Sequence, residues 1–359
     1  MATCKLCDKA KADKTNSHIL PHFLIKTAIN KEGSKQRDYE LTFSFSENEF
    51  VDAFFGRSIT LETIEKYKGR ELTEEELVKQ NPFANDYIFC DKCEKKISKL
   101  EDYYSKNIHQ KLKKPGAGKT HKDSIGNDRI IFEDVSKEVV LLFVYTIFYR
   151  CSIARYHGFN MRNWERKLRK VINKFLADDI ENTIQRIEDN KTEFVYFPVI
   201  NTHFKIEDSE DSTKNFVTIL HSDLPYFVYL NDVTFHLFTK EKHVGKSKEF
   251  FYGINDMIIQ QESVTTKSRP FQVVELTEKQ HKQVITVAFE SMANRQMKFI
   301  KVAFQEVHMK IFHTYAPAEL VHFFIQNLIT QEMPEGERYG REGMAQAMFK
   351  SCKIYYQIP

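Results

Sequence analysis

Residues 83–94 read Phe-Ala-Asn-Asp-Tyr-Ile-Phe-Cys-Asp-Lys-Cys-Glu, and the Cys-x-x-Cys near their end has a counterpart at the start of the chain, Cys4-Lys-Leu-Cys7. Two such pairs supply the four thiolates of a closed tetrahedral Zn²⁺ site. A redox role would need a thioredoxin-like βαβ context, which neither pair has. We therefore expect a structural zinc ion that closes residues 1–112 into one domain, with ligands Cys4, Cys7, Cys90 and Cys93.

The composition is that of an ordinary globular protein. The net charge of the 359-residue chain is only +3, which is too small to identify a nucleic-acid-binding protein, so that argument must be local. Four of the six cysteines fall in the two pairs, and no apolar run suits a secretion signal or a membrane span. We expect a cytoplasmic protein with reduced thiols and no membrane partner.

Three segments divide the chain. Residues 1–112 form the zinc domain, residues 113–129 form a basic, glycine-containing linker, and residues 130–359 form an accessory or regulatory domain. The predicted fold class is α+β, with a mixed helical and antiparallel-β C-terminal domain. In that domain we expect helices over 135–190, strands over 193–275 and helices over 278–330.

Some of these elements have definite expected bounds. Helical periodicity predicts a buried helix at Val135–Tyr156 and one long amphipathic helix at Asn163–Asn190. Runs rich in aromatic and β-branched residues predict strands at Phe194–Phe197, Phe216–Leu220, Tyr226–Leu230, Val233–Phe238 and Phe271–Val274.

The residues between the cysteine pairs carry a resemblance to a known family. The motifs that carry it are, in order, Cys4-x-x-Cys7, Ser17-His-Ile-Leu-Pro21, Asn85 and Cys90-x-x-Cys93-Glu94. The motifs and their order resemble those of the HNH endonucleases built on a zinc-bound treble clef. The resemblance covers about the first 110 residues, and Tyr149-Arg-Cys-Ser152 extends it toward a bacterial subset of uncharacterised HNH-like proteins. It implies a β-hairpin and helix that hold a catalytic metal, and an activity of phosphodiester hydrolysis.

The resemblance also implies roles for two residues. His18 matches the general base that takes a proton from the attacking water. Asn85 matches the asparagine that orients this histidine in one tautomer. Each also has an ordinary interpretation, because His18 could pack against the zinc knuckle and Asn85 could be a turn residue before a strand. His22, four positions after His18, we interpret as structural.

The sequence departs from the family at the catalytic metal. Ser17 and Ser98 stand where the family has metal ligands, and neither is a good ligand for a divalent ion. Glu94 and Glu101 lie seven positions apart, on about one face of a predicted helix, so one of them could take over the ligand role for Mg²⁺ or Mn²⁺. If they are only solvated helix positions, the site is inactive.

Residues 146–174 are strongly basic, with Glu165 as their one acidic residue. We expect this stretch to contact phosphates, although a solvated helix face would explain it as well. No base-reading motif accompanies it, so we expect little sequence specificity. The candidate contacts are Arg150, Arg155, Arg162, Arg166, Lys167, Arg169 and Lys170.

These observations lead to one function and two alternatives. The favoured function is a metal-dependent HNH-like endonuclease acting on DNA, with a role in bacterial defence suggested by analogy. The alternatives are a ribonuclease with the same site and a non-catalytic zinc module that binds nucleic acid or a protein. For the C-terminal domain the sequence leaves ligand sensing, a homodimer contact and a defence-system partner open.

Overall fold

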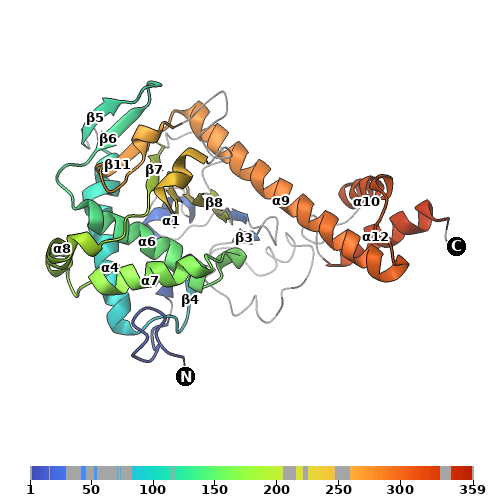
Figure 1. Ribbon diagram of the computed structural model, residues 1–359, viewed down its shortest axis with the longest axis horizontal. Helices are drawn as coiled ribbons and strands as arrows, with labels where there is room; N and C mark the ends of the chain where they lie inside the picture. The colour runs from blue at the N-terminus through green and yellow to red at the C-terminus, as the bar shows by residue number, and fades with distance from the viewer. Residues whose placement is uncertain are drawn as a thin grey trace.

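The computed structural model describes residues 2–15, 17–29, 42–45, 52–54, 71, 73, 83–114, 116, 118–204, 216–220, 225–246, 259–331 and 341–357. These residues confirm the predicted α+β class. They form a two-stranded sheet, a nine-stranded sheet and helices that pack on both faces of the larger sheet (Figure 1).

The small sheet lies next to the cysteine pairs. It joins β1 (Ser17–His18) to β4 (Ala84–Asn85) in antiparallel register. After the second cysteine pair the chain enters α4 (Asp91–Tyr104), which continues through a π-helical segment (Ser105–His109) into α5 (Gln110–Leu112). One face of α4 is apolar and buried, so the helix is anchored in the core of the protein.

The large sheet has the strand order β3-β2-β8-β9-β10-β7-β11-β6-β5. Its neighbours are antiparallel except for the parallel pairs β2–β8 and β7–β11. The strands are β2 (Thr42–Phe45), β3 (Asp52–Phe54), β5 (Lys119–Lys122), β6 (Asp128–Ile131), β7 (Val199–His203), β8 (Phe216–Leu220), β9 (Tyr226–Leu230), β10 (Val233–Leu237) and β11 (Gln272–Glu275).

The sheet crosses the segment boundaries expected from the sequence. Strands β2 and β3 come from the N-terminal segment and pair with each other, and β2 also pairs with β8 of the C-terminal segment. The expected linker, residues 113–129, contains β5 and the first residues of β6, which form an antiparallel hairpin at the sheet edge. The hairpin is stable because β6 also pairs with β11, so this stretch belongs to the sheet.

A central apolar helix covers one face of the large sheet. This helix, α6 (Lys137–Ile153), is buried along most of its length and packs against α4, α7 (Asn163–Phe175) and α8 (Ile180–Asp189). Helix α1 (His22–Ile29) contacts β8 and β9. Short helical turns connect these elements at Tyr156–Gly158, Lys191–Glu193, Glu241–Lys246 and Gln261–Ser263.

The expected single helix at Asn163–Asn190 is two helices. The chain leaves the helical conformation after Phe175, and α8 starts at Ile180. Asp179 explains the new start, because its side chain accepts a hydrogen bond from the Asn182 amide as an N-cap.

The long helix α9 (Glu278–Phe312) covers the opposite face of the sheet and then extends away from it (Figure 1). Its first half contributes Val284, Ile285 and Ala288 to a core with β9 residues. Its second half forms a separate core with α10 (Ala318–Thr330) and α12 (Arg341–Tyr355). In the described part of the chain, no helix is long and apolar enough to cross a membrane.

Candidate functional site

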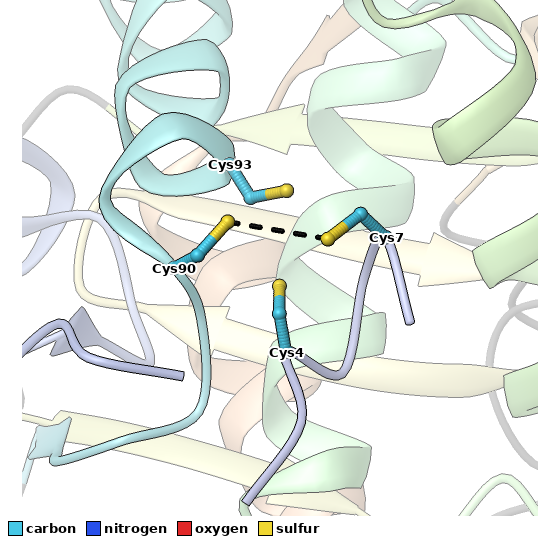
Figure 2. A group of neighbouring side chains, drawn as sticks. All are labelled: Cys4, Cys7, Cys90 and Cys93. Carbon is cyan, nitrogen blue, oxygen red and sulfur yellow. Dashed lines mark hydrogen bonds between the residues drawn. The ribbon is translucent and has the colours of Figure 1, made fainter. Parts of the chain in front are cut away.

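The four paired cysteines lie together, as the sequence predicts. Their sulfur atoms are all within 4.8 Å of one another, and three of the four side chains are buried (Figure 2). Backbone hydrogen bonds hold each pair in a tight turn: Asp8 N donates to Cys4 O at 2.9 Å, and Glu94 N donates to Cys90 O at 3.1 Å. The cluster could hold a metal ion, and four thiolates at this spacing are the ligand set that Zn²⁺ prefers.

The electrostatics of the cluster fit a cation. Hydrogen bonding from Cys93, with help from backbone amides, lowers the pKa of Cys4 to about 4. The neighbouring Cys4 thiolate raises the pKa of Cys93, and burial raises the pKa of Cys90. Without a compensating positive charge, some of the four thiols therefore stay protonated. A divalent ion at their centre would hold all four as thiolates.

The strands β1 and β4 place His18 against the segment that leads into the second cysteine pair. Ser17 lies opposite Asn85, and His18 lies opposite Ala84. The Ile19 amide donates to Phe83 O at 2.7 Å, which extends the pairing by one step. The strands β1 and β4 thus precede the second cysteine pair and α4 in the chain.

His18 shares a half-buried environment with the Glu101 carboxylate and the Arg150 guanidinium. Burial lowers the pKa of the His18 imidazole; Glu101 opposes this shift and Arg150 adds to it. An imidazole with a lowered pKa is neutral at pH 7, which is the form that accepts a proton. His18 therefore has the protonation state of a general base.

The Glu94 carboxylate, one residue after Cys93, lies in the same environment. Burial raises its pKa; Glu101 adds to the shift, while Arg150 acts against it. Its Oε2 atom is buried without a hydrogen-bond partner among the described residues, as is Ser17 Oγ. A buried carboxylate oxygen without a protein donor is chemically suited to bind a cation.

Arg150 is not on the phosphate-contacting surface where the sequence placed it. Its side chain is 2% exposed and lies in α6, facing the site. Its Nη1 donates to the His18 backbone oxygen at 2.8 Å, and its Nη2 donates to Glu101 Oε1 at 2.6 Å. The sequence signal for this buried role was an arginine inside an otherwise apolar run. Counting the basic residues of the whole stretch obscured that signal.

Other expected site residues are not brought together. No hydrogen bond joins the side chains of Asn85 and His18 in the described residues, and Ser98 donates to Lys95 O on the helix surface. The four cysteines are the one group among the described residues whose ligand atoms gather closely enough for a metal. Arg150 binds one oxygen of Glu101, whereas Glu94 Oε2 has no hydrogen-bond partner among the described residues.

The remaining basic candidates lie in α7 or just before it. Some of their side chains contact another described side chain, and the others form no ion pair with one. Three are engaged: Arg155 with Glu165 at 3.0 Å, Arg169 with Asp8 at 3.2 Å, and the Lys167 ammonium 3.8 Å from the Trp164 ring centroid. The other three are exposed and form no ion pair with a described residue; we call them the α7 stripe: Arg162, Arg166 and Lys170.

The spacing of the α7 stripe fits an extended polyanion. Arg166 and Lys170 are four positions apart, so they lie on one side of α7 about 6 Å from each other, and Arg162 is the N-cap residue just before the helix. The Arg169–Asp8 ion pair also ties α7 to the first cysteine knuckle, which places the stripe near the metal cluster.

Comparison of the chain with protein-family models, curated proteins and solved structures finds no match.

Proposed function

We propose that this protein is a metal-dependent, HNH-like endonuclease that hydrolyses phosphodiester bonds of DNA. The observation that carries the proposal is the position of His18 on β1, which pairs with β4 ahead of the second cysteine pair and is joined through Arg150 to Glu101 on α4. A base next to two carboxylates is a suitable set for metal-assisted hydrolysis of a phosphodiester.

In the proposed reaction His18 accepts a proton from the water that attacks the phosphorus atom. Glu94 would hold a divalent ion such as Mg²⁺ or Mn²⁺, which supplies stabilisation of the charge that develops on the phosphate. Glu101 raises the basicity of His18, and Arg150 balances the charge of both carboxylates. We assign Zn²⁺ to the four cysteines, where it fixes the start of α4 and hence the position of Glu94.

The partner in this proposal is nucleic acid. The α7 stripe offers three cations without protein partners among the described residues, and such contacts bind phosphates without reading bases. DNA is favoured because most of the resembled family cuts DNA, and a role in bacterial defence rests on the same analogy. A cytoplasmic location is part of the proposal, since a cluster of four thiols suits a reducing compartment.

The first alternative is a non-catalytic zinc module. It is favoured by Ser17 and Ser98, which replace the usual metal ligands, and by the absence of a second compact ligand group in the described residues. The second alternative is a ribonuclease with the same site, which the basic stripe would serve equally well.

The decisive experiment measures cleavage of plasmid DNA, and of RNA in parallel, across a series of divalent ions. Wild-type protein is compared with His18→Ala and with His22→Ala, a matched control whose ring lies 5.8 Å from that of His18. We expect ion-dependent cleavage that His18→Ala abolishes and His22→Ala retains. The acid limb of the pH profile should lie below pH 6.5, because the pKa of His18 is lowered from that value.

Each outcome selects one hypothesis. Cleavage of RNA alone would favour the ribonuclease. Binding of DNA without cleavage by any zinc-loaded sample would favour the binding module. Equal cleavage by wild type and His18→Ala would remove His18 from the reaction.

A further inference from the structure

Arg150 is the one charged residue within the buried stretch Val139–Ser152 of α6. Burying a guanidinium is costly, and hydrophobic residues of similar volume often serve stability at least as well as a buried ion pair. Its presence at this position therefore calls for an explanation other than packing.

The contacts of Arg150 join two elements of the proposed site. One terminal nitrogen binds the backbone oxygen of His18 on β1, at 2.8 Å, and the other binds the Glu101 carboxylate on α4, at 2.6 Å. The planar fork of arginine can make both bonds at once, whereas a lysine ammonium has no such fixed geometry. Arg150 thus fixes the distance between the strand that carries His18 and the helix that carries Glu94 and Glu101.

Strand β1 needs this support. It is two residues long, and among the described residues it pairs only with the equally short β4. So short a sheet holds its residues with few hydrogen bonds, and isolated pairs of strands are marginally stable. The hydrogen bond from Arg150 of α6 to the His18 carbonyl attaches this strand to the protein core at the proposed general base.

Arg150 is also unsuited to direct contact with substrate. With 2% of its side chain exposed and both terminal nitrogens engaged, it cannot reach a phosphate without breaking the bonds described above. Its role must be exerted through the groups it holds.

We infer that Arg150 is a positioning residue of the proposed nuclease site, which clamps β1 to α4 and so sets the placement of His18 relative to the carboxylates. The inference rests on the proposed function for its catalytic consequence, but the clamp itself is a structural property. A displacement of about 1 Å in a reacting group can lower a rate about 100-fold, which sets the expected size of the effect.

The test compares Arg150→Gln and Arg150→Lys with a control, Asp232→Asn, which removes the charge from a similarly buried pair away from the site (His109 Nε2 to Asp232 Oδ2, 3.3 Å). DNA cleavage is measured as kcat and KM, and amide hydrogen exchange is measured for residues 17–20. We expect Arg150→Gln to lower kcat about 100-fold with KM within about twofold, and to speed exchange in 17–20. Arg150→Lys should recover part of kcat, and Asp232→Asn should change neither.

The outcomes separate the clamp from the proposed function. If wild type cleaves nothing but Arg150→Gln alone speeds exchange at 17–20, the clamp stands and the nuclease proposal fails. If wild type cleaves and Arg150→Gln changes neither kcat nor exchange, or raises KM instead, the positioning role is wrong. Should Arg150→Gln not fold, Arg150→Lys carries the same comparison, since one ammonium group cannot reproduce the fixed two-bond geometry of the guanidinium.

Discussion

The sulfur atoms of Cys7 and Cys90 lie 4.0 Å apart, although the two residues come from different knuckles (Figure 2). Two sulfur ligands on one tetrahedral Zn²⁺, with bonds of about 2.3 Å, are about 3.8 Å apart. The spacing is thus close to that of two ligands on one ion. It joins the start of the chain to the start of α4.

The first prediction concerns metal content. Protein purified without chelators should contain one Zn²⁺ per chain, and Cys90→Ser should lose it, because three cysteines cannot complete the closed site. Since binding of structural zinc is coupled to folding, the variant should also lose stability, measurably as a lower Tm. Metal content is checked by elemental mass spectrometry after gel filtration.

The matched control for this prediction is Cys352→Ser, because Cys352 is a partly buried thiol of α12 outside the cluster. It should keep the zinc. Full zinc content in Cys90→Ser, or zinc loss in Cys352→Ser, would contradict the assignment.

Local sequence patterns predict much of this fold, but not its pairings. The apolar runs at Phe216–Leu220 and Tyr226–Leu230 coincide with β8 and β9. The run at Phe194–Phe197 is not a strand, because the aromatic rings of its ends pack near Tyr145, and the Tyr145 hydroxyl accepts a hydrogen bond from the Phe197 amide. A side chain from α6 thus takes the place of a partner strand, and no local pattern can reveal that.

The candidate site was likewise predictable from the sequence only in part. Cysteine spacing predicts the metal cluster, since the ligands must converge on one point. The role of Arg150 could not be predicted from the basic composition of its neighbourhood, because a charge count does not distinguish an exposed side chain from a buried one. The pairing of β2 with β8 was equally hidden, since it joins residues far apart in the chain.

A second prediction follows from Tyr104, which links α4 to the large sheet. Its hydroxyl accepts a hydrogen bond from Asn201 Nδ2 at 2.9 Å, and both side chains are fully buried. Tyr104→Phe would leave this amide unpaired, so we expect a loss of about 1–3 kcal/mol in the free energy of unfolding. Urea denaturation measures it. Tyr87→Phe, at a side chain 55% exposed, is the control and should change nothing; equal stabilities would show that the bond contributes little.

A third prediction concerns pH and His236, in the middle of β10. Complete burial lowers its pKa from 6.5 to about 3. Below pH 6.5 the unfolded chain therefore binds a proton that the folded chain does not, and stability should fall as the pH decreases from about 6.5 toward about 3. The slope should approach about 1.4 kcal/mol per pH unit for this group.

His236→Gln should flatten this slope, measured by denaturation at a series of pH values. His313→Asn, at the exposed C-cap of α9, is the comparison and should retain it. An unchanged slope in His236→Gln would mean that other groups, such as His18 with its lowered pKa, dominate the acid instability.

The last prediction concerns the α7 stripe. If Arg162, Arg166 and Lys170 each contact a phosphate, replacing all three by Gln should weaken DNA binding, and similarly for all sequences. Each lost contact removes about 0.9 from the slope of log affinity against log salt, so the slope should fall by up to about 2.7. Binding is measured by fluorescence anisotropy at several salt concentrations.

The control removes three lysines that already have ion-pair partners: Lys111 with Asp134, Lys119 with Glu133 and Lys122 with Asp128. It changes the net charge by the same amount, so it separates a local contact from the overall field of the protein. We expect a smaller effect on the salt slope, because these cations neutralise carboxylates and release fewer DNA counterions. Equal slopes in the two triple variants would indicate attraction by net charge alone and would remove the stripe from the proposed interface.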